Sequence, residues 1–309
     1  MAHVRFQVGD LTAVIGDNEG YAEHRAGYNG LHWLQHRSDA ESVFVPGVAG
    51  LNFEHIFDGD QELRDAAGER RVFFEPRRSP MRLRQLAEDT VELYQPATPT
   101  FHLESWTVFR LVAPAAVDFW FRCRPQQHSF RYGYIGLFWA SYINAPEDRS
   151  MYFRHRGQWQ QLCSQRHNLH STVVHQDSRL ELQFTPQLPS SLYQNLSPLR
   201  FDEPFFYGRV RDLVLIFLFD FPQWREGQPE LRLTHSPSGG GYNKQKETAN
   251  PAWDFQWVIP RYEVMREYRL RGRLICRPRC SRQEIHHEVQ TWLRNRDQLT
   301  PWKWSSNTP

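Results

Sequence analysis

The sequence contains few cysteines. Among its 309 residues only four are cysteine, at positions 123, 163, 276 and 280. A chain of this length can bury a stable core without disulfides. Cys276 and Cys280 together supply half of the ligands of a zinc site, and no second pair follows at zinc-finger spacing. We therefore expect reduced thiols and a cytoplasmic protein.

Long hydrophobic runs and an excess of one charge are also lacking. The mean hydropathy is −0.67, and the densest apolar run, Leu213–Phe221, has the length of a strand and not of a membrane span. The N-terminal stretch MAHVRFQVGD lacks the basic and then apolar pattern of a signal peptide. Lys and Arg total 37 against 35 for Asp and Glu, without the basic stripe of a nucleic-acid binder. We expect neither a membrane nor a nucleic acid as partner.

Several common catalytic motifs are missing as well. The glycine triplet 239–241 is not followed by Lys and Ser or Thr, and no strand–helix–strand unit surrounds it. A phosphate-binding loop is therefore not expected. The chain shows no dinucleotide-binding glycine pattern, no serine nucleophile elbow and no reactive-cysteine context. These absences argue against the common hydrolase and dehydrogenase plans.

Aromatic residues, by contrast, are abundant. They make up 14% of the chain, alongside 20 Pro and 18 Gly. Short stretches rich in aromatic and β-branched residues alternate with turn residues, which is typical of strands. About fifteen such stretches predict an all-β fold, a large antiparallel two-sheet sandwich in one domain over residues 1–300, followed by a loose tail over 301–309. The expected strands include Val4–Val8, Leu11–Ile15, Leu180–Phe184, Leu213–Phe219 and Tyr262–Ile275.

One helix is expected near the C-terminus. Ser281 and Glu284 have the spacing of a capping box, in which each side chain bonds the other residue's backbone N–H. Ile285, Val289 and Trp292 then recur at helical spacing and define an apolar face.

The stretch 117–123 alternates in a way that separates its two faces. Val117, Phe119, Phe121 and Cys123 form the expected core face, and Asp118, Trp120 and Arg122 point the other way. Pairing with the preceding strand through Ala113-Pro114 would bring Glu104 and Trp106 beside them. This set suits either the floor of a sugar cleft or cross-strand ion pairs on an outer sheet face.

Two acid–imidazole pairs, Glu23-His24 and Glu54-His55, are the main candidates for chemistry. Neighbours on a regular strand face opposite ways, so we expect a His of one segment to work with a carboxylate of another. His suits acid–base catalysis because its pKa lies near neutrality. In GLNFEHIFDG, residues 50–59, His55 would share its face with Phe53 and Phe57. The alternatives are a buried His bonded to backbone, and one divalent metal held by both pairs; otherwise no cofactor is expected.

The segments GDNEGYAEHRAGYNG, FVPGVAGLNFEHIFDG, LFWASYINAPEDRSMYF and SPSGGG…NPAWDFQ are spread over residues 16–260. By these segments the chain resembles a bacterial family whose pattern is similar to the galactose-mutarotase-like β-supersandwich. Aldose epimerases, several polysaccharide lyases and the end domains of some glycosidases share that fold. Where aldose epimerases carry Leu-His-Gly-Gly, this chain has Glu54-His55-Ile-Phe, which leaves the reaction type open.

Together, the residues and the resemblance predict an enzyme acting on a sugar or short oligosaccharide, by epimerisation, β-elimination or hydrolysis in that order. The acid–base candidates are His55, His24, Glu54, Glu23, Asp254 and Tyr142. The substrate-binding candidates are Arg25, Asn29, Asn52, Arg122, Trp139, Asn144, Tyr207, Arg209 and Trp253. The competing interpretations are a non-catalytic carbohydrate-binding protein and an assembly protein, and the oligomeric state is left open.

Overall fold

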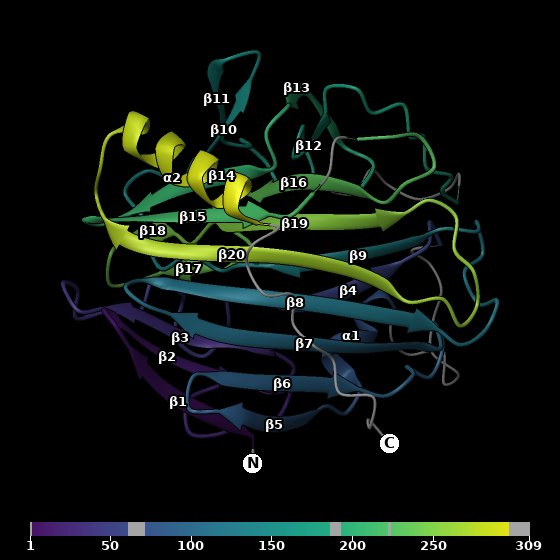
Figure 1. Cartoon of the computed structure of the whole chain (residues 1–309), viewed down its shortest axis with the longest axis horizontal. Helices are drawn as coiled ribbons and strands as arrows, with labels where there is room; N and C mark the ends of the chain where they lie inside the picture. The colour runs from purple at the N-terminus through teal and green to yellow at the C-terminus, as the bar shows by residue number, and fades with distance from the viewer. Residues whose placement is uncertain (1, 61–71, 186–192, 222–223, 297–309) are drawn as a thin grey trace.

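Two layers of strands form the molecule in the computed structural model, which describes residues 2–60, 72–185, 193–221 and 224–296 (Figure 1). The first layer is a nine-stranded sheet in the order β11 (Gln158–Leu162), β10 (Met151–His155), β14 (Phe205–Val210), β15 (Leu213–Phe219), β20 (Tyr268–Pro278), β8 (Ala116–Pro125), β7 (Leu103–Val112), β6 (Thr90–Gln95) and β5 (Arg82–Ala87). The second layer is a six-stranded sheet in the order β13 (Leu196–Phe201), β12 (Thr172–His175), β16 (Glu230–Ser236), β19 (Ala252–Ile259), β9 (Ile135–Ala140) and β4 (Asn52–Phe57). Every described pair is antiparallel except β12 with β13. The predicted all-β sandwich is confirmed.

A three-stranded sheet extends the second layer beyond β4. It contains β1 (His3–Val8), β2 (Leu11–Gly16) and β3 (Gly30–His36). Leu31 and Gly50 join it to the segment before β4, because each donates its backbone N–H to the other's carbonyl at 2.9 Å. The remaining elements are short: η1 (Val72–Phe74), α1 (Glu75–Arg78), β17 (Tyr242–Asn243) and β18 (Thr248–Ala249).

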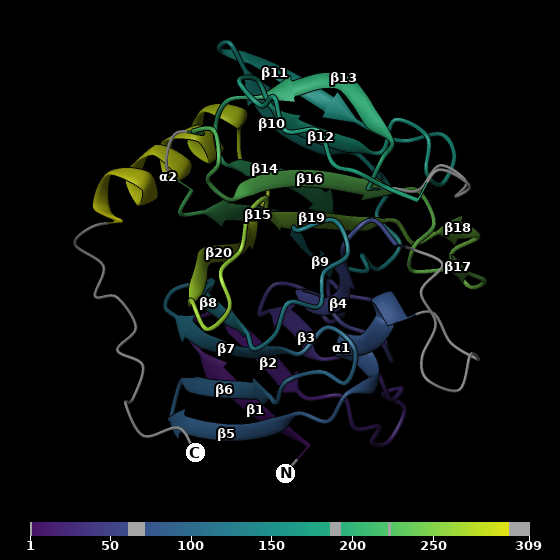
Figure 2. The same ribbon diagram turned by 90° about the vertical axis from the view of Figure 1, so that its right-hand side faces the viewer.

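The single long helix of the described residues, α2 (Arg282–Asn295), lies against the outer side of the nine-stranded sheet (Figure 2). The predicted capping box at Ser281 and Glu284 is present. The predicted apolar face of Ile285, Val289 and Trp292 is buried against β14 and β15. No described helix has the length and apolar content needed to cross a membrane.

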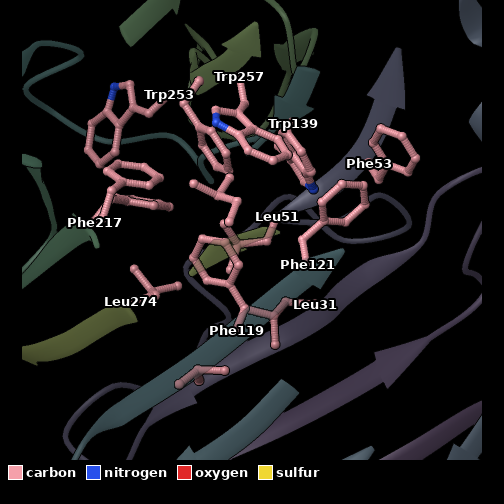
Figure 3. Close-up of a cluster of buried hydrophobic side chains, with 14 of the residues drawn as sticks. Leu31, Leu51, Phe53, Phe119, Phe121, Trp139, Phe217, Trp253, Trp257 and Leu274 are labelled. Carbon is pink, nitrogen blue, oxygen red and sulfur yellow. The ribbon is translucent and has the colours of Figure 1, made fainter. Parts of the chain in front are cut away.

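Aromatic side chains fill the space between the two layers (Figure 3). The Trp139 ring stacks between Phe53 and Phe255, at centroid distances of 5.2 and 4.9 Å, and is 1% exposed. Trp253 is fully buried nearby, and its indole N–H donates to the Arg149 carbonyl at 2.9 Å. Trp139 and Trp253 were expected to carry the substrate. Their burial in the core overturns that expectation, because neither ring presents a face to a ligand.

Two predicted strands differ from the structure. Leu180–Phe184 has strand-like alternation but no ladder among the described residues, and a strand is defined by such a ladder. Strand β20 starts at Tyr268 and not at Tyr262, because the intervening segment turns: Met265 has a φ of 68° and its N–H donates to Pro125.

The outward face of β8 carries cross-strand ion pairs. The predicted core face is confirmed, since Val117, Phe119, Phe121 and Cys123 all join the main core. On the other face Arg122 donates to Glu267 at 2.9 Å and lies over the Trp106 ring at 4.0 Å. Arg122 was an expected substrate-binding residue. It lies instead on the outside of the nine-stranded sheet, in the second of the two arrangements that the sequence allowed.

We expect Trp139→Ala to lower the free energy of unfolding by about 3–5 kcal/mol, because it opens a cavity between the sheets. Urea unfolding followed by circular dichroism measures the change. Met265→Ala is the control: this side chain is 57% exposed, so its loss should alter stability by less than about 0.5 kcal/mol. Equal effects of the two substitutions would contradict the placement of Trp139 in the core.

Candidate functional site

Strand β4 contains a β-bulge at the acid–imidazole pair. Phe53 lies opposite Trp139 of β9, but His55 lies opposite the very next residue, Phe138, so Glu54 is an extra residue. A bulge turns two successive side chains toward one side of a sheet. Phe53 and Ile56 accordingly join the core, whereas Glu54 and His55 lie together on the outer face. The expectation that these neighbours face opposite ways is therefore wrong.

The Asn29 side chain holds the bulge in place. Its Oδ1 accepts from the Phe53 N–H and its Nδ2 donates to the Phe53 carbonyl, both at 3.0 Å. The Asn29 backbone N–H also donates to Asn52 Oδ1 at 3.1 Å. Buried backbone groups that lose ladder partners need such replacements. Asn29 and Asn52 were expected to bind substrate, but their bonds give them the role of positioning β4.

Glu54 is held by an arginine and a tyrosine. Arg77 Nη1 donates to its Oε1 at 2.8 Å, and the Tyr142 hydroxyl lies 2.7 Å from Oε2 and 2.8 Å from Oε1. The side chain is only 6% exposed. Burial raises the pKa of Glu54, while Arg77 and Tyr142 act to lower that pKa. These two partners favour the ionised carboxylate, but burial outweighs them, and the pKa of Glu54 lies above its ordinary value.

Arg77 is presented by α1, which is tied down on several sides. Asn18 Nδ2 donates to the Pro76 carbonyl at 2.7 Å, and Gln95 Nε2 donates to the same oxygen at 2.8 Å. The Arg77 guanidinium also donates through Nε to Gly27 at 2.6 Å and lies 3.9 Å from the centroid of the Tyr28 ring. Its position beside Glu54 is thus set by the fold before any ligand binds.

His55 sits among aromatic rings. It stacks on Phe138 at 4.8 Å and meets the edges of Phe74 and Phe73 at 4.6 and 5.1 Å. Its Nδ1 is bonded by the Tyr193 hydroxyl. Its Nε2 has no hydrogen-bond partner among the described residues and lies 3.7 Å from Glu54 Oε1, longer than a direct hydrogen bond.

Burial, and next the positive charge of Arg77, holds the pKa of His55 well below its usual value. The imidazole is therefore neutral near pH 7. Burial also raises the pKa of Tyr193 well above 10, so its hydroxyl keeps its proton and is able to donate to Nδ1. When it does so, the hydrogen of the neutral ring is on Nε2, on the side of Glu54.

Asp254 completes the group from strand β19. Its neighbours Trp253 and Phe255 point into the core, so Asp254 points to the same outer face as Glu54. The Ser141 N–H donates to its Oδ1 at 2.9 Å, the one hydrogen bond it makes within the described residues. Burial, reinforced by the charge of Glu54, raises the pKa of Asp254 well above 3.8. Its environment thus favours the protonated acid, and within the described residues only the Ser141 N–H opposes this, whereas Glu54 has both Arg77 and Tyr142 to favour its ionised form. The Glu54 cluster comprises Glu54, His55, Arg77, Tyr142, Tyr193 and Asp254.

A cavity of about 630 Å³ adjoins the Glu54 cluster. Phe74, which touches His55, and Arg77, which bonds Glu54, both line it. Asn18, Gly27 and Arg78 complete part of its wall. Ligand pockets commonly have volumes of about 300–1,000 Å³, so this space is large enough for a small molecule, and Arg77 is the member of the cluster that lines it.

The structure separates the other expected site residues from this cluster. His24, Glu23 and Arg25 lie on the loop after β2, where His24 stacks on His32. Asn144 binds Glu41 and the Ser42 carbonyl. Tyr207 is buried beneath α2, where Arg282 donates to its hydroxyl, and Arg209 lies on the same strand, β14. Of the six acid–base candidates, Glu54, His55 and Tyr142 come together, and Asp254 lies on the same face, where the charge of Glu54 raises its pKa.

Sequence patterns did not reveal Arg77 or Tyr193. Arg77 occurs in the charged stretch Glu75–Arg78, which has no apolar face, and Tyr193 lies outside any strand. The nearest signal is the cluster of arginines around position 77.

A metal site is not evident in the part of the chain that the structure describes, where no three His, Cys, Asp or Glu side chains are grouped to bind an ion. All four cysteines are free thiols. Burial raises the pKa of Cys276 to about 12, so this thiol is a poor ligand near neutral pH.

No protein-family model and no curated protein matches this sequence. Similar solved structures include a putative aldose 1-epimerase from Escherichia coli K12, with 9% identity, 90% of this chain and 99% of that chain covered, and a TM-score of 0.45. A galactose mutarotase-like protein from Lactobacillus casei has 9% identity, coverage of 89% and 100%, and a TM-score of 0.48. A mutant heparan sulfate lyase from Pedobacter heparinus has 12% identity, 90% of this chain but 35% of the lyase covered, and a TM-score of 0.42. At such low identity no residue role is carried over from these proteins.

We expect Asp254→Asn and His55→Gln to change stability with opposite pH dependence. The free energy of unfolding of the wild type falls as pH rises from 3.8 through the raised pKa of Asp254, because the folded state holds this proton more tightly than the unfolded state. The stability of Asp254→Asn relative to the wild type should therefore increase with rising pH. Wild type loses stability as pH falls below 6.5, because unfolded His55 takes up a proton that the folded form refuses. The stability of His55→Gln relative to the wild type should therefore increase as pH falls. Each difference in unfolding free energy should change by at most about 1.4 kcal/mol per pH unit.

Urea unfolding of wild type and both variants across this pH range measures the two slopes. Equal pH dependence in all three proteins would show that neither group is perturbed by burial.

Proposed function

We propose that the protein is an enzyme that acts on a sugar by acid–base catalysis at the Glu54 cluster. The observation that carries this proposal is the bulge in β4, which sets Glu54 and His55 on one face, with Nε2 and Oε1 3.7 Å apart. A general base and a general acid must meet at one substrate. Bulges recur next to active sites because they re-aim side chains.

The surroundings of the two carboxyl groups, Glu54 and Asp254, indicate which acts as the base and which as the acid. Arg77 and Tyr142 favour the ionised form of Glu54, whereas Asp254 has a single hydrogen bond within the described residues and lies near the charge of Glu54. Environments that push two pKa values apart assign the roles. Glu54 is the base and Asp254 the acid.

The first candidate reaction is opening and reclosure of a sugar ring, as in an epimerase or mutarotase. Glu54 takes the proton of the anomeric hydroxyl, and the anomeric carbon forms a carbonyl as its bond to the ring oxygen breaks. Asp254 supplies the proton to that ring oxygen. Rotation and the reverse transfers close the ring with the other configuration, and His55 orients a hydroxyl through its Nε2–H.

The walls of the site suit such a substrate. The half-buried rings of Phe73 and Phe74 lie beside His55, and aromatic faces pack against the apolar C–H face of a sugar. The adjoining cavity of about 630 Å³ has room for a monosaccharide or a short oligosaccharide. No metal or organic cofactor enters this mechanism.

β-Elimination from a uronate is the second candidate, favoured by the contact between Arg77 and Glu54. A guanidinium beside the base could pair with a sugar carboxylate and acidify the neighbouring C–H. Glu54 would take that proton as a carbon–carbon double bond forms and the glycosidic C–O bond breaks. The Tyr142 hydroxyl, which keeps its proton because burial holds its pKa well above 10, would protonate the leaving oxygen.

We expect the wild-type protein to accelerate anomer exchange of at least one free aldose or uronic acid, measured by NMR exchange spectroscopy. Glu54→Gln and Asp254→Asn should each lower the rate by about 10²–10⁴, the usual contribution of a positioned acid or base. Glu92→Gln is the matched control, because Glu92 is buried like Glu54 and bonded to an arginine but lies on the nine-stranded sheet. It should leave the rate unchanged.

The same variants, tested with free sugars and with uronate oligosaccharides, separate the alternatives. β-Elimination would be assigned if the wild type produces the ultraviolet absorbance of an unsaturated uronate from the oligosaccharides and Tyr142→Phe does not. Sugar binding without acceleration of any reaction would establish a non-catalytic carbohydrate-binding protein. If neither binding nor turnover occurs across the panel, the proposal is wrong.

A further inference from the structure

A second β-bulge lies in β3, next to the sheet that carries the Glu54 cluster. Ile15 of β2 pairs with Leu31, but the preceding residue, Val14, pairs with Trp33, so His32 is an extra residue. Leu31 and Leu34 point into the core. His32 and Trp33 are therefore both turned to the outer face, by the same kind of bulge that turns Glu54 and His55 to one face.

Stacked rings surround the imidazole of His32. Its ring lies 3.4 Å from that of His24, and its Nδ1 is 3.0 Å from the Tyr21 hydroxyl. Gly16 makes this position available, because a Cβ there would come within 2.0 Å of His32 Cε1. Two strands and the loop after β2 thus cooperate to seat this ring.

A cavity of about 540 Å³ opens beside these rings. The residues that line it include Arg5, Tyr21, Glu23, His24, His32 and Trp33. No residue of its lining belongs to the Glu54 cluster or lines the cavity beside it. We name it the His24 pocket.

The His24 pocket combines aromatic surface with polar groups of several kinds. Trp33 and Tyr21 are half-buried, while Arg5 and Glu23 are exposed. The His24 Nε2–H donates to the Tyr28 carbonyl at 2.9 Å, which leaves Nδ1 as an acceptor. Burial lowers the pKa of His24, so the ring is neutral at physiological pH. The pocket therefore offers apolar ring faces, one acceptor, one cation and one anion.

We propose that the His24 pocket is a second binding site for a sugar ring, separate from the Glu54 cluster. A pyranose has an apolar face for the half-buried Trp33 ring, and its hydroxyl edge can both donate to and accept from the polar groups, which include the Tyr21 hydroxyl. Arg5 and Glu23 both line the pocket, so it carries charges of both signs and suits a neutral ligand whose hydroxyls can accept from one and donate to the other. Two of the residues first expected in the catalytic site, His24 and Glu23, acquire a role here.

The test uses methyl β-D-glucopyranoside and methyl β-D-galactopyranoside, whose blocked anomeric carbon prevents ring opening. Protein labelled with 5-fluorotryptophan gives one ¹⁹F signal for each tryptophan, and the signal missing in Trp33→Phe identifies Trp33. We expect at least one glycoside to shift the Trp33 signal with a Kd on the order of 1–10 mM, equally in wild type and in Glu54→Gln. Tyr21→Ala should weaken this binding at least fivefold.

Each other result overturns the proposal. If neither glycoside shifts the Trp33 signal, the pocket binds no such sugar. A shift that disappears in Glu54→Gln means that Trp33 reports binding at the Glu54 cluster and not a separate site. If benzyl alcohol shifts the Trp33 signal and neither glycoside does, the pocket binds apolar rings and not sugars. Because the probes cannot be turned over, the outcome does not depend on whether the proposed reaction at the Glu54 cluster is correct.

Discussion

The pair of hydrogen bonds between the Asn29 carboxamide and the Phe53 backbone is the constraint on which the candidate site depends. Without the bulge that it stabilises, regular alternation would send Glu54 or His55 into the aromatic core between the sheets. A buried carboxylate or imidazole without partners is costly there. The bulge instead places both groups where Arg77, Tyr142 and Tyr193 can bond them.

The buried polar groups of the Glu54 cluster lower the free energy of unfolding. Burial opposes the ionised form of both Glu54 and Asp254, and it opposes the charged form of His55. The aromatic core beneath, around Trp139, supplies the hydrophobic stabilisation that allows this arrangement to persist. Such a division between a stable scaffold and a polar, strained site is common in proteins that bind or transform small molecules.

Two β-bulges orient the side chains of both candidate sites in the second layer. In β3 and in β4 an extra residue interrupts the ladder and brings two neighbouring side chains onto the outer face. The loop between β2 and β3 connects the two places: His24 faces one pocket, and four residues later Tyr28 stacks on Arg77 beside the other. A single loop thus contributes to both candidate binding sites.

Several features could be predicted from local pattern alone. Alternation in β8 identified its core face, the capping box located α2, and the aromatic and turn-residue content indicated a two-sheet sandwich. These succeed because period-two alternation and helix capping are local properties of the chain. Aromatic content alone could not separate rings that fill a core from rings that face a ligand, so Trp139 and Trp253 were misplaced.

The sequence by itself determined the all-β architecture, the C-terminal helix and the residue types that meet at Glu54, His55, Tyr142 and Asp254. Only the tertiary structure decided that Glu54 and His55 share one face, and that Arg77 and Tyr193 join them. A bulge is set by the register between two strands and by a side chain 24 residues away, Asn29 on Phe53. No periodicity within GLNFEHIFDG contains that information.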